Sequence, residues 1–158
     1  MSHDPRFSTI IPSPIGNLGI HIHNNKLTRI VFLGTDQSSQ LSNENEYQPL
    51  HNELTAYFQN PQHDFQFPLE VKGTPFQKTV WQALRQIPVS TTISYQELAT
   101  HLGTSPRAIG NACRANPTPI IVPCHRVVAK NHMGGFVGKT AGEMIAIKRW
   151  LLTHEKVV

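Results

Sequence analysis

Three helix-start signals lie between residues 74 and 105, and they constrain the fold of this chain more than any other feature. The stretch TPFQ forms a capping box, with Thr74 as N-cap, a proline in the first turn and a glutamine able to reach back. SYQE, which begins at Ser94, has the same pattern. Gly103 ends the second helix, and Ser105 with the proline after it begins a third. The segment therefore predicts three short helices in succession.

The second and third of these helices are joined by a tight turn that contains a glycine, which is the skeleton of a helix-turn-helix. In that arrangement the third helix, PRAIGNACRAN, is presented to DNA. Arg107 and Arg114 are seven residues apart, so both can project from one helix face. Small residues such as Ala108 and Gly110 let the backbone approach a groove closely. The apolar faces that pack these helices are expected to be formed by Phe76, Val80, Leu84, Ile87, Leu98 and Leu102.

Charge is distributed unevenly along the chain. Residues 1–72 hold four Lys and Arg against seven Asp and Glu, a net charge of −3. Residues 73–158 hold ten against three, a net charge of +7. A solvated positive face is one interpretation of the basic part, and contact with a polyanion is the other. We expect two domains, 1–72 and 73–158, of which the second meets the polyanion.

The first domain carries the pattern of a small sheet with one helix. Apolar and polar residues alternate in NLGIHIH, the asparagine pair at 24–25 signals a turn, and residues 27–33 resume the apolar run. The polar stretch TDQSSQLSNENEYQ predicts a loop. A short amphipathic helix follows, and its apolar face is expected to consist of Leu50, Leu54, Tyr57 and Phe58.

The stretch PIIVPCHRVV, residues 119–128, places a cysteine beside a histidine. The prolines around its apolar run predict a buried extended segment. A thiol is a good nucleophile only when it is deprotonated, which requires a nearby base or positive charge. Adjacent side chains of an extended segment point to opposite faces, so Cys124 and His125 need a bridging water or a kink after Pro123 to exchange a proton. Without either, Cys124 is a buried core thiol.

The end of the chain predicts a glycine-rich loop, HMGGFVGKTAGE, and a last helix. This helix is expected to end near His154. Its inward residues are expected to be Met144, Ile147, Trp150 and Leu151.

Cysteine and histidine usage favours neither a disulfide nor a metal site. Cys113 and Cys124 do not form a CxxC pair or half of a zinc ribbon, and the nine histidines are scattered. The N-terminus MSHDPRFSTI lacks the apolar core of a secretion signal, and no apolar run has the length of a membrane span. We expect a cytoplasmic protein with no metal and no cofactor.

The stretch PCHRVV, with RAIGNACRANPTPIIV and SYQELA before it, resembles the motifs of the O6-alkylguanine-DNA alkyltransferases, a family of direct-reversal DNA repair proteins. The resemblance extends upstream through GTPFQKTVWQALRQIP and downstream to KRWLLTHE, so it covers residues 73–155 densely and SPIGNLGI weakly. It implies an α/β (α+β) protein. A ribonuclease-H-like sheet-plus-helix domain would have a structural role, and a mainly helical domain would carry a winged-helix-like helix-turn-helix docked in the minor groove.

The resemblance implies a role for each matching residue. Cys124 matches the acceptor thiol, which attacks the O6-alkyl carbon and keeps the alkyl group permanently. His125 resembles the residue that takes the thiol proton through a water, and Glu155 the carboxylate that orients this histidine. Asn116 corresponds to the hinge asparagine of the active-site turn. Tyr95 resembles the tyrosine that rotates the 3′ phosphate and donates a proton towards the leaving guanine.

The resemblance also implies how DNA is held. Arg107 matches the arginine finger that enters the base stack in place of the flipped nucleotide. The expected DNA-binding residues are Tyr95, Arg107, Ala108, Gly110 and Arg114. The expected pocket residues are Val127, Phe136 and Val137, of which the last two replace a tyrosine and a serine that are usual in the family. The partner is expected to be double-stranded DNA with O6-alkylguanine, and O4-alkylthymine as a further substrate, bound by a monomer.

Departures from the family and competing interpretations bear on this transfer. The turn GTSPR is shorter than the common version, KTAGEM is an expected insertion, and Cys113 is expected to pack rather than to accept an alkyl group. A non-enzymatic lesion-binding relative would lack the acceptor cysteine, whereas Cys124 is present. A cysteine hydrolase would need its histidine elsewhere and an oxyanion site. A transcription factor fused to a sensor domain would need a further zinc-thiol module.

Overall fold

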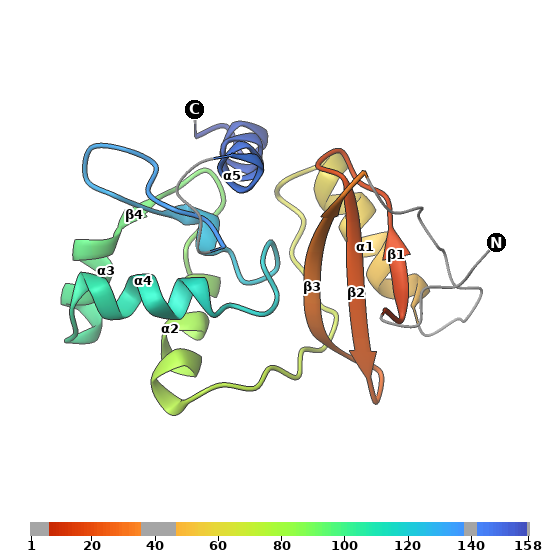
Figure 1. Ribbon diagram of the computed structural model, residues 1–158, viewed down its shortest axis with the longest axis horizontal. Helices are drawn as coiled ribbons and strands as arrows, with labels where there is room; N and C mark the ends of the chain where they lie inside the picture. The colour runs from red at the N-terminus through yellow and green to blue at the C-terminus, as the bar shows by residue number, and fades with distance from the viewer. Residues whose placement is uncertain (1–6, 36–46, 138–141, 158) are drawn as a thin grey trace. The chain divides into compact units, whose positions relative to one another are not determined.

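A computed structural model describes residues 7–35, 47–137 and 142–157 of the chain (Figure 1). The chain divides into two compact units, Met1–Lys72 and Gly73–Val158. Most of the polar loop TDQSSQLSNENEYQ and the first part of the KTAGEM insertion lie outside the described residues.

The N-terminal unit is built on a three-stranded antiparallel sheet in the order β1 (Thr9–Ile11), β2 (Asn17–His23) and β3 (Lys26–Gly34). Asn24 and Asn25 adopt φ angles of 51° and 61°, so they form the tight turn that the asparagine pair predicted. Strand β1 was not predicted, because it is three residues long and all three are buried, which leaves no alternation to detect.

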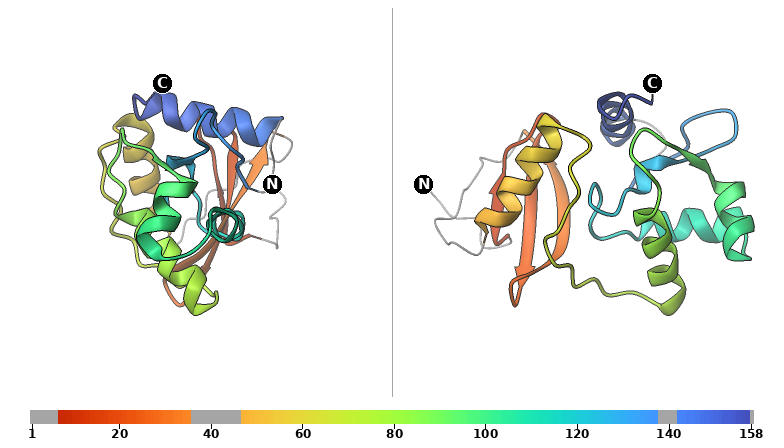
Figure 2. Two further views of the ribbon diagram at one scale, coloured as in Figure 1. Left: turned by 90° about the vertical axis from the view of Figure 1, so that its left-hand side faces the viewer. Right: turned by 180° about the vertical axis from the view of Figure 1, so that it is seen from behind.

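Helix α1 (Gln48–Gln59) lies across one face of this sheet, as Figure 1 and the rear view in Figure 2 show. Leu50, Leu54 and Tyr57 are buried, and Phe58 at the edge of the same stripe is half-buried. The helix therefore closes an apolar core against the sheet. This small antiparallel sheet and the helices of the chain confirm the mixed α/β architecture that the sequence predicted.

The C-terminal unit contains the three predicted helices, α2 (Pro75–Arg85), α3 (Tyr95–Leu102) and α4 (Pro106–Arg114). The Thr74 capping box is complete, since Gln77 N donates to Thr74 Oγ1 at 3.1 Å and Thr74 N donates to Gln77 Oε1 at 2.9 Å. Gly103 ends α3 with a φ of 66°, a left-handed conformation that glycine adopts without steric cost. Helices α3 and α4 pack together as a helix-turn-helix.

One apolar residue of α2 is not where its spacing predicted. Phe76 is 39% exposed, whereas Trp81 is buried. The indole of Trp81 needs an acceptor when it is buried, and its Nε1 donates to the carbonyl oxygen of Ala112 at 2.8 Å. The bond fixes α2 to α4, so tertiary contact rather than helical period decided which aromatic side chain faces inward.

The expected extended segment before Cys124 is wrong, because residues 117–122 form turns and bends. Asn116 accounts for this: its Nδ2 donates to Val122 O at 2.8 Å, and its Oδ1 accepts from Thr118 N at 3.0 Å. A 3₁₀ turn, η1 (Cys124–Arg126), follows. Strand β5 (Val127–Val128) then pairs in parallel with β4 (Ile93–Ser94).

The last helix, α5 (Glu143–His154), closes the unit. None of the helices in the described part of the chain is long and apolar enough to cross a membrane.

Candidate active site

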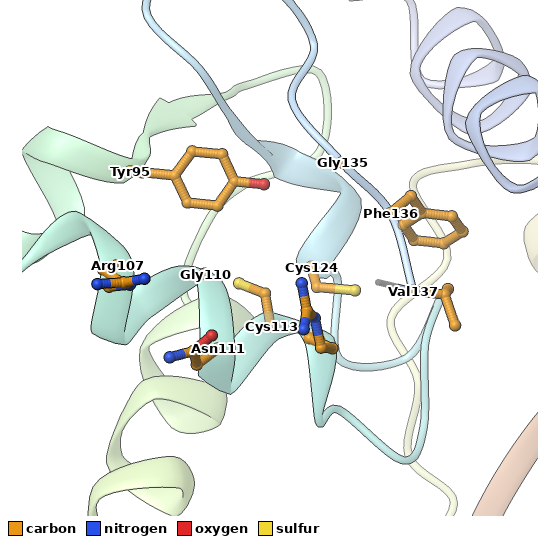
Figure 3. Close-up of a pocket in the computed structure, with 10 residues that line it drawn as sticks. Tyr95, Arg107, Gly110, Asn111, Cys113, Cys124, Gly135, Phe136 and Val137 are labelled. Atoms are coloured by element: carbon orange, nitrogen blue, oxygen red, sulfur yellow. The ribbon is translucent and has the colours of Figure 1, made fainter. Parts of the chain in front are cut away.

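A pocket of about 430 Å³ opens in the C-terminal unit beside α4 (Figure 3). In this view Tyr95 and Arg107 lie on one side, Phe136 and Val137 on the other, and the two cysteines between them. The pocket therefore joins four segments of the chain: the start of α3, helix α4, the turn η1 and the loop before α5. The predicted site residues among its lining are Tyr95, Arg107, Gly110, Arg114, Cys124, Phe136 and Val137. Asn111, Cys113 and Gly135 also line it.

Cys124 begins the turn η1 and is only 5% exposed. Pro123 before it has φ −83° and ψ 67°, and Cys124 N donates to Val122 O at 2.8 Å, so the chain bends sharply at the thiol. Burial raises the pKa of Cys124, which the side chain of Asn116 and the charge of Lys148 oppose. The thiol is therefore neutral at rest and needs a base before it can attack.

His125 and Glu155 form a fully buried pair, although they lie 30 residues apart in the sequence. Nε2 of His125 lies 2.8 Å from Oε2 of Glu155, and both side chains are 0% exposed. Arg126 completes the set, because its Nε donates to Oε1 of Glu155 at 2.8 Å and its Nη2 to Oε2 at 3.1 Å. The Glu155 carboxylate thus holds the imidazole ring of His125 in one orientation, while the Arg126 guanidinium offsets the negative charge of the carboxylate.

The imidazole of His125 is suited to accept a proton. Burial lowers its pKa below the ordinary value, although the Glu155 carboxylate acts in the opposite direction. The ring is therefore neutral near pH 7, and with Nε2 donating to Glu155, Nδ1 carries the free lone pair. Nδ1 is buried and has no hydrogen-bond partner among the described residues. A bound proton there would be stabilised by Glu155.

Tyr95 is placed against the glycine-rich loop. Because β4 pairs with β5, the first residue of α3 lies beside the segment that follows Cys124. A Cβ on Gly134 would lie 2.9 Å from Cε2 of Tyr95, and the φ of Gly134 is 75°, so only glycine fits there. Burial raises the pKa of Tyr95 to about 12, which keeps its hydroxyl protonated as a donor.

The remaining predicted residues lie outside the pocket lining. Val127 is fully buried in the core, and its carbonyl oxygen accepts from Lys148. Ala108 is half-buried on α4. Asn116 is half-buried, and its Nδ2 donates to the carbonyl oxygen of Val122, two residues before Cys124.

Val137, in contrast, lines the pocket. Its φ is 51°, a conformation that is costly for a β-branched residue.

Two residues of the site were missed from the sequence, Arg126 and Lys148. Lys148 is fully buried in α5 together with Ile147 and Leu151, whereas the expected inward residues Met144 and Trp150 are only half-buried. Lysine is seldom buried, so periodicity alone gave no reason to place it inside. Arg126 is part of the motif PCHR, but its role was not predicted because its partner Glu155 is 29 residues away in the sequence.

Among the described residues, no group of three or more His, Cys, Asp or Glu could hold a metal ion. Cys113 and Cys124 are both free thiols. The site brings together a recessed thiol, a neutral imidazole hydrogen-bonded to a carboxylate, and a tyrosine hydroxyl.

Fold and site together define a class: helix-turn-helix proteins that carry a recessed cysteine nucleophile beside the second helix. A family model described as the DNA-binding domain of 6-O-methylguanine DNA methyltransferase matches residues 75–157. The chain belongs to this family, the methylated-DNA–protein-cysteine methyltransferases.

Relatives in the family align along nearly the whole chain. A probable methylated-DNA–protein-cysteine methyltransferase of Acanthamoeba polyphaga mimivirus is 39% identical over 154 residues, which are 93% of this chain and 95% of that protein. The constitutive methyltransferase of Bacillus subtilis (strain 168) is 34% identical over 162 residues, with 96% of each chain covered. The structure of Mycobacterium tuberculosis OGT in complex with DNA matches with a TM-score of 0.76 and 37% identity, over 93% of this chain and 91% of that one.

Proposed function

We propose that this protein repairs alkylated DNA by direct reversal, with Cys124 as the acceptor that takes the alkyl group from O6-alkylguanine and keeps it. The observation that carries the proposal is the position of Cys124 in a pocket beside α4, in the turn that also holds the His125–Glu155 pair. O4-alkylthymine is proposed as a second substrate. One molecule of protein repairs one lesion, because the thioether formed at Cys124 is a stable product that does not revert to the thiol in water.

The proposed chemistry balances within the site. The thiol proton of Cys124 passes through a water to Nδ1 of His125, and Glu155 stabilises the resulting imidazolium. The S–C bond forms as the C–O6 bond breaks, in line. The hydroxyl of Tyr95 donates its proton to the leaving guanine, and the resulting phenolate regains a proton from the His125 imidazolium through solvent. In net terms the thiol loses one proton and the guanine gains one.

Double-stranded DNA with the lesion flipped out is the proposed partner. The target carbon is inaccessible inside a duplex, and flipping a nucleotide costs a few kcal/mol. Arg107 and Arg114 are exposed on α4 at the pocket, where Arg107 can fill the space of the flipped base. Gly110 lies between them and lets the helix backbone approach the minor groove. The DNA complex of the Mycobacterium tuberculosis relative supports this partner.

The pocket is complete within a single copy of the chain, which supports a monomer. Two free cysteines support a reducing compartment, in keeping with the cytoplasm. Residues 1–72 are proposed to act as a structural domain, and residues 73–158 to bind DNA and accept the alkyl group.

Mass spectrometry tests the proposal directly. After incubation with a duplex that carries one O6-methylguanine, Cys124 should gain one methyl group per protein molecule. Trypsin cleaves after Arg114, so Cys113 and Cys124 fall in separate peptides and the acceptor is identified without ambiguity. A methyl group on Cys113, or repeated turnover, would refute the assignment. The Cys124→Ala protein should bind the duplex and transfer nothing.

A further inference from the structure

Helix α4 presents a stripe of four residues to the pocket: Arg107, Gly110, Asn111 and Arg114. Their spacing of three and four residues places them on one side of the helix. The side chains of Arg107, Asn111 and Arg114 are exposed, and Figure 3 shows that of Asn111 on α4. The helix therefore offers a continuous polar surface at the pocket.

Asn111 is a free polar group on a fixed support. Its side-chain carboxamide makes no hydrogen bond with the described residues. The helix beneath it is held by two contacts: Trp81 Nε1 donates to Ala112 O at 2.8 Å, and Ser105 Oγ accepts from Ala108 N at 3.1 Å. Asparagine is a poorer helix former than alanine, so helix stability gives no reason for it at this position. The carboxamide is available to a ligand, and the helix holds it in place.

The four residues of the stripe differ in what they can offer a ligand. The side chains of Arg107 and Arg114 carry only hydrogen-bond donors, and Gly110 has no side chain. The carboxamide of Asn111 carries an acceptor, Oδ1, and two N–H donors on Nδ2. Within the stripe, Asn111 is therefore the one side chain that can accept a hydrogen bond from a nucleic acid base.

An acceptor matters in the minor groove, where base pairs are hard to tell apart. Adenine, thymine and cytosine present only acceptors there, whereas guanine adds a donor, its N2 amino group, beside the acceptor N3. A carboxamide can therefore make two hydrogen bonds with guanine, because Oδ1 accepts from N2 while Nδ2 donates to N3. At an A·T pair it can only donate. Asn111 lies one turn, about 6 Å, along α4 from Arg107, so with Arg107 in place of the flipped base it reaches a neighbouring base pair.

We propose that Asn111 is a specificity-determining residue that contacts the minor-groove edge of a base pair next to the lesion and favours guanine there. The inference rests on the proposed function, which places lesion-bearing duplex DNA against α4. It adds a preference for flanking sequence to a helix whose arginines, as phosphate contacts, carry none. The preference acts on binding of the duplex and not on the reaction of Cys124 with a free base.

Inosine tests the proposal, because it is guanosine without the N2 amino group. Fluorescence anisotropy measures binding of the Cys124→Ala protein, which cannot consume the lesion, to two duplexes with G·C or I·C pairs on both sides of O6-methylguanine. The ratio of the two dissociation constants, I·C over G·C, should be about tenfold larger with Asn111 than with Asn111→Ala in the same background. Comparing ratios cancels the easier opening of I·C pairs.

Gln82→Ala is the matched control, since it removes an exposed carboxamide from α2 outside the pocket lining. It should leave the ratio of dissociation constants unchanged. Equal ratios with and without Asn111, or a lack of any binding, would overturn the proposal.

The reciprocal experiment adds the amino group instead of removing it. 2,6-Diaminopurine in place of the flanking adenines gives an A·T pair the missing minor-groove donor. It should strengthen binding by the protein with Asn111 several-fold more than binding by Asn111→Ala. An equal effect on both proteins would overturn the proposal. Since none of these measurements requires alkyl transfer, absence of methyl transfer would count against the proposed role of Cys124 alone.

Discussion

The two units of the chain bury different kinds of side chain. Among the described residues, the N-terminal unit buries one polar side chain, the hydroxyl of Thr9, in an otherwise apolar core. The C-terminal unit buries Thr118, His125, Lys148 and Glu155, each 0% exposed. Burying charged groups gives little or no net stability even when they are paired. The difference indicates that the first core serves stability, whereas the second gives up stability to hold reactive groups in place.

Removing Glu155 should have the largest effect, because it breaks the buried network from its centre. Glu155→Gln leaves Arg126 and His125 without their charged partner, so the free energy of unfolding of the C-terminal unit should fall by about 3–5 kcal/mol. Both tryptophans, Trp81 and Trp150, lie in this unit, so their fluorescence in a urea titration reports its unfolding alone.

The same variant should also lose most alkyl transfer in a single-turnover assay. Glu143→Gln, at the exposed start of α5, is the matched control and should change neither quantity. A Glu155→Gln protein with unchanged stability would contradict the idea that the second unit depends on a buried charge network.

An apolar truncation in the first unit should separate stability from chemistry. Leu54→Ala removes a fully buried side chain from α1, and the free energy of unfolding of the N-terminal unit should fall by about 3 kcal/mol. Circular dichroism on urea titration measures this loss, with exposed Thr55→Ala as the control. Reaction of Cys124 with free O6-benzylguanine should keep its rate while the unit remains folded. A large drop in that rate would show that the first unit contributes to the chemistry.

Arg107→Ala should act on DNA repair with a smaller effect. Repair of O6-methylguanine in a duplex should slow by about tenfold, or about 1.4 kcal/mol, because the space of the flipped base is no longer filled. Reaction with free O6-benzylguanine should be slowed far less. Arg85→Ala, an exposed arginine on α2, controls for the loss of one positive charge. Equal slowing of both reactions would place Arg107 in the chemistry instead.

The smallest expected effect is a pH dependence of stability that His125 gives to the C-terminal unit. The pKa of His125 is lowered by burial, so folding favours its neutral form. In the unfolded chain the imidazole of His125 takes up a proton near pH 6.5. Its contribution to the free energy of unfolding is therefore complete above that pH. The contribution is lost as the pH falls, by at most about 1.4 kcal/mol per pH unit. Tryptophan fluorescence in urea at pH 5 to 8 measures this slope, which His125→Gln should flatten. An unchanged slope in the variant would assign the pH dependence to other groups.

Local signals in the sequence predicted local structure well. The Thr74 capping box, the left-handed Gly103 and the asparagine turn were each readable, because caps and tight turns depend on residues within a few positions. The motif around Cys124 indicated the family, which the comparisons confirm. Where the sequence misled, the contacts came from far along the chain: Asn116 bends the segment before Cys124, and Trp81 finds its acceptor on α4.

The sequence by itself determined the helices, the asparagine turn, the family and the placing of a cysteine beside a histidine. Only the tertiary structure decided what surrounds that pair. Glu155 lies 30 residues from His125, and the carbonyl oxygens bound by Lys148 lie 21 and 13 residues from it. Periodicity indicates which face of a helix is apolar. It carries no information on which distant polar group will contact a buried charge and offset its desolvation. Folding brings these groups together, and with them the reactivity of the thiol.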